Sequence, residues 1–142
     1  MAIEDADRTL AKQPDSDECR EAISRAVEAA KAPANPDDIE ELGGGWTGEE
    51  ALAISLYCSL TAKDFESGLR DAVNHSGDSD STGAITGNLL GTMWGVEAIP
   101  DRWREHMELA QVVTAVGRDL HFHFGSGHHF EFPEDWDRYP GW

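Results

Sequence analysis

The segment best suited to chemistry is the acidic stretch that runs from residue 74 to residue 83. Within it, Asp78 and Asp80 stand two residues apart, next to the hydroxyl of Ser81, and Gly77 and Gly83 flank the group. Carboxylate and hydroxyl oxygens are hard ligands, which Mg²⁺, Mn²⁺ and Ca²⁺ prefer. A tight loop directs such side chains toward one point. The pattern therefore indicates a site for a hard divalent cation.

Two other interpretations of this stretch need to be weighed. An EF-hand calcium loop matches at its early positions, which are Asp78, Asp80, Thr82 and Gly83. Its twelfth position requires a bidentate glutamate and is Leu89 here, so this alternative fails at its most important ligand. The other alternative is a solvated turn in which Asp78 or Asp80 caps the following helix. The Asp-x-Asp pair alone does not decide between such a turn and a metal site.

A second group of metal-binding residue types lies near the carboxyl end. It comprises four histidines, His121, His123, His128 and His129. Zinc binding is one interpretation, but the accompanying cysteine spacing of a structural zinc site is missing. We favour a short strand or an irregular tail with exposed histidines and packed phenylalanines.

Helical periodicity dominates the rest of the chain and predicts an all-α fold, a compact multi-helix bundle. The predicted helices cover residues 17–31, 37–42, 48–60, 64–74 and 82–95, with two short helices between 100 and 120. We expect a polar lead-in over residues 1–14, the helical domain over 15–120, and an irregular, acidic tail rich in histidine and aromatic residues over 121–142.

Local signals mark where these helices begin and end. Asn35 suits an N-cap and Pro36 the first helical position. Thr47 and Glu50 have the spacing of a capping box at the start of a further helix. The three glycines between these two starts predict a helix end, and we expect Trp46, which follows them, to be buried.

Two of the predicted helices are apolar on most faces, which is typical of a central position. The helix over 48–60 includes Cys58, for which we expect an inert core thiol. In the helix over 82–95, glycines recur at every fourth position, and each costs roughly 0.5–1 kcal/mol relative to alanine. We therefore expect neighbouring backbones to approach this glycine stripe closely. The residues expected to fill the remaining gaps are Ile85, Leu89, Leu90, Met93 and Trp94.

Composition excludes several classes of function. The formal net charge is −17, from 28 acidic and 11 basic residues, whereas nucleic-acid phosphates are bound by clustered Lys and Arg. The negative net charge does not exclude a small anionic ligand, because a bound divalent cation inverts the local electrostatic field. The acidic start does not resemble a signal peptide, no apolar run is long enough to cross a membrane, and Cys19 and Cys58 imply no disulfide framework. We expect a cytoplasmic protein without nucleic-acid or membrane partners.

Several separated motifs, in the right order, resemble the ADP-ribosylglycohydrolase family, which includes the dinitrogenase reductase-activating glycohydrolases. Residues 43–53 are similar to one family segment, and residues 76–87 are similar to the family's Gly-Gly-Asp-Thr-Asp-Thr-type signature. Further matches are Asp64, Phe65, Ala72, Val73, Asn74, Gly91, Gly95, Ile99, Pro100 and Trp103. Together these matches extend over most of the predicted helical domain.

The resemblance implies an all-α fold with a binuclear Mg²⁺ or Mn²⁺ site. It assigns the metal ligands to Asp78, Asp80 and Ser81. The implied reaction is hydrolysis of the glycosidic bond that joins ADP-ribose to a modified protein side chain or a small molecule. In such a site the metals orient the ribose hydroxyls and activate a water, while fixed carboxylates stabilise the oxocarbenium-like charge. No catalytic residue is assigned.

This chain departs from the family in one important respect. Family members are longer and carry a second acidic cluster of Thr-Asp-Asp type near their N-terminus, and residues 1–40 contain no such motif. We therefore expect the C-terminal part of such a fold. Two carboxylates and one hydroxyl supply half of the six oxygens that Mg²⁺ prefers, so we expect weak metal binding by these residues alone.

Three functional hypotheses follow. The first is a family hydrolase whose site is completed by other groups. The second is a non-catalytic remnant or a module that binds ADP-ribose or metal with a partner chain. The third is an acidic calcium- or zinc-binding protein. Uncovered apolar helix surface would favour self-association or marginal stability.

Overall fold

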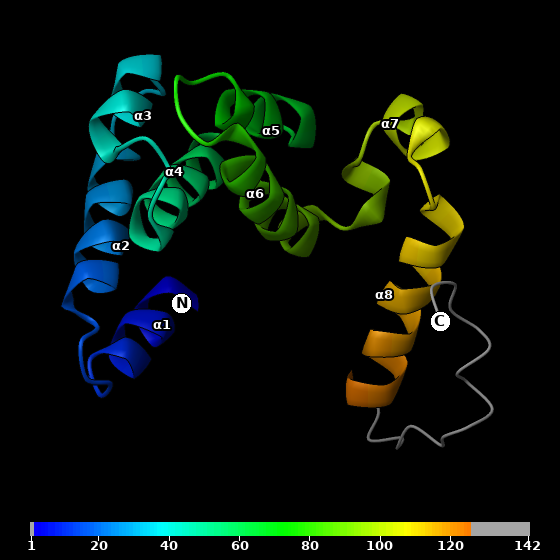
Figure 1. Cartoon of the computed structure of the whole chain (residues 1–142), viewed down its shortest axis with the longest axis horizontal. Helices are drawn as coiled ribbons and strands as arrows, with labels where there is room; N and C mark the ends of the chain where they lie inside the picture. Colours follow the sequence, from blue (N-terminus) through cyan, green and yellow to red (C-terminus); the bar gives the residue numbers. More distant parts are fainter. Residues whose placement is uncertain (1, 126–142) are drawn as a thin grey trace. The chain divides into compact units, whose positions relative to one another are not determined.

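The structure is a computed structural model that describes residues 2–125, and helices dominate this range (Figure 1). The elements are α1 (Ala2–Leu10), α2 (Asp17–Ala29), α3 (Pro36–Leu42), α4 (Gly48–Thr61), α5 (Phe65–Val73), α6 (Ser79–Trp94), the short 3₁₀-helix η1 (Val96–Ala98), α7 (Asp101–His106) and α8 (Ala110–Gly125). No strand occurs between residues 2 and 125, so the all-α prediction is confirmed. None of the helices in this range is long and apolar enough to cross a membrane. The chain divides after Pro100 into two compact units.

Helix α4 is the centre of the first unit, as its apolar sequence predicts. It contacts α2 and α3 on one side and α5 and α6 on the other (Figure 1). The core that these helices enclose consists of Ala22, Ala26, Ile39, Leu42, Ala53, Ile54, Tyr57, Cys58 and Ala72. Burial raises the pKa of the Cys58 thiol to about 12, which agrees with the inert core thiol that we expected.

Residues 2–10 form a helix, α1, that the sequence patterns did not predict. The chain between α1 and α2 is held by Ser16, whose hydroxyl donates to the carbonyls of Leu10 (2.7 Å) and Gln13 (3.1 Å). Arg20 on α2 forms an ion pair with Asp7 on α1, with Nε 2.8 Å from the carboxylate. These contacts attach α1 to the surface of α2 without burying any of its side chains.

Helix α3 begins as predicted. The Asn35 side chain accepts a hydrogen bond from the Asp37 N–H at 3.2 Å, and Pro36 occupies the first position. Its buried face carries Ile39 and Leu42. In addition, the Tyr57 hydroxyl on α4 donates to the carboxylate of Asp38 at 2.8 Å. Since apolar burial and polar contacts both attach α3 to α4, α3 provides a fixed platform beside the core.

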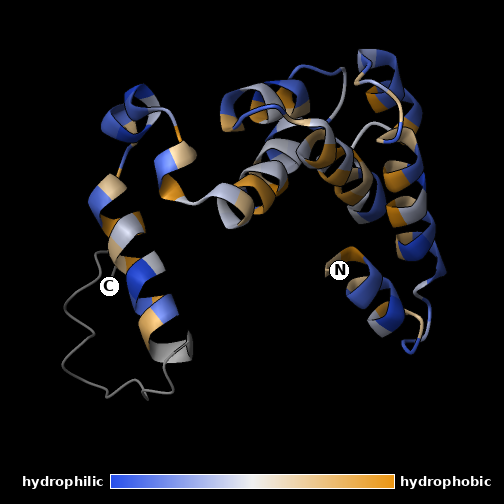
Figure 2. Cartoon of the chain, turned by 180° about the vertical axis from the view of Figure 1, so that it is seen from behind, coloured by the Kyte–Doolittle hydropathy of each residue, from blue (hydrophilic) through white to orange (hydrophobic). Residues whose placement is uncertain are grey.

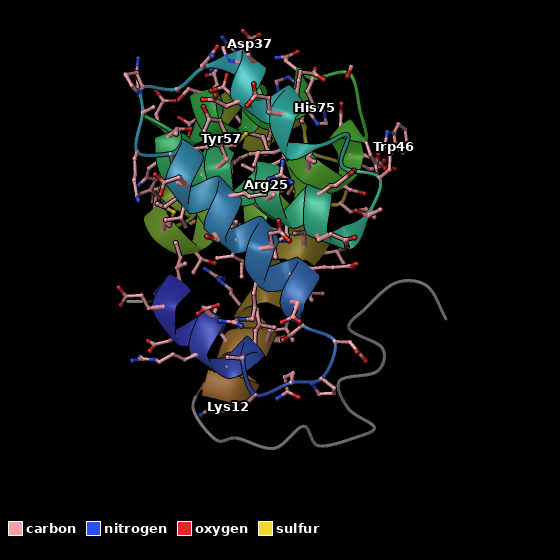
Figure 3. The ribbon with its side chains drawn as sticks, turned by 90° about the vertical axis from the view of Figure 1, so that its left-hand side faces the viewer. Lys12, Arg25, Asp37, Trp46, Tyr57 and His75 are labelled. Atoms are coloured by element: carbon pink, nitrogen blue, oxygen red, sulfur yellow. The ribbon has the colours of Figure 1, made fainter. Side chains whose placement is uncertain are left out.

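The segment between α3 and α4 differs from the prediction in two ways. Thr47 makes no capping hydrogen bond, and Glu50 instead accepts from the backbone N–H groups of Gly44 and Trp46, both at 3.2 Å. The carboxylate therefore orders the glycine-rich loop rather than closing a capping box. Trp46 is not buried but 74% exposed, and it projects from the edge of the molecule (Figure 3).

Helix α6 begins at Ser79, three residues earlier than predicted, and is less buried than expected. A Cβ at Gly83 would lie 2.7 Å from a side-chain methyl of Val73, so the helices pack closely here, although through a side chain and not through the neighbouring backbone that we expected. A Cβ at Gly91 would meet no heavy atom within 4 Å, so the expectation of close packing is wrong there. Leu90 is fully buried, but Met93 is 53% exposed. The glycine stripe thus serves packing only at the start of the helix. Figure 2 shows the distribution of apolar residues along the helices.

The second unit is described from Asp101 to Gly125 and contains α7 and α8, which contact each other. Helix α8 continues through residues 121–125, where we had expected a strand or an irregular tail, so that expectation is wrong for these residues. Helix propagation from residue 110 overrides the local two-residue alternation. His128 and His129 lie outside the described residues, and the zinc interpretation remains a prediction.

Candidate metal centre

The three predicted ligands lie together where α5 gives way to α6. Asp78 occupies the N-cap position of α6, with φ −77° and ψ 81°, but its side chain makes no capping hydrogen bond. Asp80 and Ser81 belong to the first turn of the same helix. The alternative of a simple capping turn stays open for Asp78, because the backbone N–H of Ser81 in the first turn of α6 is among the groups that lower the pKa of its carboxyl.

The charge on Asp78 is influenced by both of the other predicted ligands. Polar interaction with the side chain of Asp80, and next with that of Ser81, lowers the pKa of the Asp78 carboxyl. Asp78 is half-buried, as is Ser81, while Asp80 is exposed. The α6 N-terminus also favours negative charge at this position. The result is an ionised carboxylate with a second carboxylate and a hydroxyl beside it, open to solvent on one side.

The backbone around Asp78 is fixed by the glycine-rich loop that precedes α4. The Asp78 N–H donates to the carbonyl of Gly44 at 2.8 Å. A Cβ at Gly77 would lie 1.8 Å from the same carbonyl oxygen, so no side chain fits at residue 77. Gly45, which has a φ of +74°, lies against Thr82 and the backbone of Asp78. Two loops more than thirty residues apart thus form one structure around the acidic residues.

His75 connects the two ends of the acidic turn. Its Nδ1 accepts from the Gly77 N–H at 3.1 Å, so the hydrogen of a neutral ring resides on Nε2, which lies 3.0 Å from the hydroxyl of Thr82. The buried Thr82 hydroxyl in turn donates to the carbonyl of Ala72 at 2.6 Å. This network joins the end of α5 to the first turn of α6. The sequence contained no local signal for it, because a histidine beside an acidic loop has no characteristic spacing.

The arrangement offers oxygen donors of the kind that hard cations prefer, but few of them. Two carboxylates and one hydroxyl account for half of an octahedral shell. Among residues 2–125, no group of three or more His, Cys, Asp or Glu side chains is placed to hold a metal ion. The donor set therefore suits one side of a Mg²⁺ or Mn²⁺ ion whose remaining ligands come from water or from groups beyond these three residues.

Comparison with known proteins places this chain in a family. The family model for ADP-ribosylglycohydrolase matches residues 1–127. The chain belongs to the ADP-ribosylglycohydrolase family.

Individual relatives match shorter segments. The chain is 37% identical over 83 residues to an uncharacterized protein of Archaeoglobus fulgidus, which covers 58% of this chain and 27% of that protein. It is 42% identical over 60 residues to the ADP-ribosyl-[dinitrogen reductase] glycohydrolase of Rhodospirillum rubrum, which covers 42% of this chain and 20% of that protein. It is 23% identical over 94 residues to the bovine ADP-ribosylhydrolase ARH3, and the match covers 58% of this chain and 26% of that protein. The aligned part of the chain therefore spans about a quarter of the length of the curated relatives. No solved structure matches the chain.

Proposed function

We propose that this protein takes part in metal-dependent hydrolysis of the glycosidic bond between ADP-ribose and a modified side chain or small molecule. The observation that carries this proposal is the placement of Asp78, Asp80 and Ser81 at the N-cap and in the first turn of α6, in a chain of the ADP-ribosylglycohydrolase family. The ligands proposed for Mg²⁺ or Mn²⁺ are these three residues. Two names among the relatives, an ADP-ribosylarginine hydrolase and ADP-ribosylhydrolase ARH3, support ADP-ribosyl linkages as the class of substrate.

The bound metal would supply charge that orients substrate hydroxyls and lowers the pKa of a bound water. The chain itself contributes the preorganisation of the ligands. Gly44 holds the Asp78 amide and His75 holds the Gly77 amide, so the Asp78 carboxylate is positioned before any cation binds. A ligand held in place in this way loses less conformational freedom on binding.

Trp46 provides a surface for the substrate beside this site. It is exposed, and it directly follows Gly45, whose Cβ position would lie 3.7 Å from the Cβ of Asp78. Exposed aromatic rings bind nucleobases by stacking, which contributes on the order of 1–3 kcal/mol per base. We propose that Trp46 contacts the adenine of ADP-ribose. This position also explains why a large aromatic side chain is left in solvent.

A second candidate function is favoured by the number of donors. Three side chains leave the metal shell half filled, which fits a module that binds metal or ADP-ribose and needs a partner chain to complete catalysis. The substrate of either form would be an ADP-ribosylated protein or small molecule. We propose that the protein acts in the cytoplasm.

The decisive experiment measures free ADP-ribose released from peptides ADP-ribosylated on arginine or on serine. It is run with Mg²⁺ or Mn²⁺, with chelator, and with Asp80→Ala. Asp71→Ala is the matched control, because it removes the same charge from an exposed position on α5. Metal-dependent release that only Asp80→Ala abolishes supports the hydrolase.

Two other results would change the conclusion. If the folded chain releases nothing but binds Mn²⁺ in a manner that requires Asp80, the binding module is supported instead. Absence of release, of Mn²⁺ binding and of ADP-ribose binding would refute both candidate functions.

A further inference from the structure

A carboxylate from α3 holds the acidic turn from outside. Glu40 accepts two hydrogen bonds from Ser76, one from its backbone N–H at 3.1 Å and one from its hydroxyl at 2.7 Å. These two bonds lower the pKa of the Glu40 carboxyl, which keeps it ionised and acceptor-only. The two residues are 36 positions apart in sequence, so this contact is tertiary.

The contact completes a series along the turn. Three consecutive backbone N–H groups precede α6, and each has its own acceptor. Ser76 donates to Glu40, Gly77 to the imidazole of His75, and Asp78 to the Gly44 carbonyl. Of these acceptors, the Glu40 carboxylate is the one supplied by a side chain of a different helix. The path of the backbone into Asp78 is thereby set one residue at a time.

Helix α3 is a suitable anchor for this purpose. Its opposite face is buried through Ile39 and Leu42, and Asp38 accepts from the Tyr57 hydroxyl in the core. Glu40 therefore transmits the position of a packed helix to an exposed turn. Because Glu40 and Ser76 are themselves exposed, their hydrogen bonds contribute little to the stability of the whole unit.

We infer that Glu40 is a positioning residue for the metal-binding turn. Its two hydrogen bonds from Ser76 fix the turn so that Asp78 is oriented for the cation. This inference rests on the proposed metal site. Residues hydrogen-bonded directly to metal ligands commonly change metal affinity by about 10- to 100-fold when they are mutated, and Glu40 acts one step further out, through Ser76. The exposure of this pair places the expected effect at the lower end.

The test compares Mn²⁺ affinity, measured by the electron paramagnetic resonance of free Mn²⁺, among matched variants of the full chain. Glu40→Ala should raise the dissociation constant about tenfold. Glu41→Ala is the control, because it removes the same charge from the neighbouring exposed position of α3, where the contact from Arg25 is to the backbone carbonyl and is retained. It should change affinity by less than about twofold. Glu40→Gln, which keeps one acceptor oxygen, should fall between.

A double-mutant cycle identifies the partner. Ser76→Ala should weaken Mn²⁺ binding to a smaller extent than Glu40→Ala, and Glu40→Ala should have less effect in the Ser76→Ala background than in the parent chain. The melting temperature should hardly change in these variants. A purely structural role of Glu40 would instead lower the melting temperature and leave Mn²⁺ affinity unaffected. Equal effects of Glu40→Ala and Glu41→Ala would overturn the inference.

A second measurement separates this inference from the proposed function. Exchange of the Ser76 amide proton with water, followed by NMR without metal, should be faster in Glu40→Ala than in Glu41→Ala. If the parent chain binds no Mn²⁺, the metal site is refuted, and so is the effect of Glu40 on it. Faster exchange would then still support the hold on the turn, whereas unchanged exchange would overturn it.

Discussion

Replacing Gly77 by alanine should separate the two loops that build the candidate site. The new Cβ would lie 1.8 Å from the carbonyl oxygen of Gly44 and 2.5 Å from its carbonyl carbon. These are backbone atoms, so no side-chain rotation relieves the clash. Restoring ordinary contact at 3.4 Å requires a displacement of about 1.6 Å. The hydrogen bond from Asp78 to Gly44, now 2.8 Å long, would not survive such a shift.

The expected cost is the sum of two effects. Overpacking of a close contact costs about 1–3 kcal/mol, and loss of a backbone hydrogen bond adds roughly 1 kcal/mol. Urea denaturation followed by circular dichroism would measure the total. Gly91→Ala is the control: a Cβ there meets nothing within 4 Å, and replacing a helix-interior glycine should stabilise by about 0.5–1 kcal/mol. If Gly77→Ala were as stable as the parent chain and bound Mn²⁺ equally well, the loop contact would not be what positions Asp78.

Two further predictions concern acid sensitivity and association. Hydrogen bonds from the backbone N–H and the side chain of Ser67 lower the pKa of Asp64. The stabilisation that the ionised Asp64 gives to α5 is therefore fully present above the ordinary pKa of 3.8, and it is lost as the pH falls through the lower folded-state pKa. Asp64→Asn should flatten the acid dependence of helix content, which circular dichroism measures. Because Met93 and Trp94 are exposed, we expect the chain to self-associate, which light scattering would measure. A monomer with a cooperative, high melting transition would contradict this expectation.

The helices from α2 to α6 were predictable because most of their signals are local. Asn35 and Pro36 fix the start of α3, as predicted. Sequence periodicity identified α4 as central, because a helix that is apolar all round has no other stable position. Such signals depend on residues within one or two turns of each other.

The errors arise where spacing alone does not identify the surroundings of a residue. Glu50 has the spacing of a capping box but accepts from the backbone N–H groups of Gly44 and Trp46 in the loop before it. Spacing cannot tell which glycines of a stripe meet a neighbour, and Gly83 does while Gly91 does not. For Trp46, hydrophobicity predicted burial, whereas the loop geometry directs the ring into solvent.

The same distinction applies to the candidate site. The ligand types could be read from four adjacent residues, but the groups that hold them could not, because Glu40 and Gly44 lie more than thirty positions upstream. This separation has a functional consequence. Since the acidic residues sit on a turn with little burial of its own, their orientation depends on α3 and on the glycine-rich loop. Substitutions in those segments should therefore alter metal affinity while leaving the Asp-x-Asp-Ser sequence untouched.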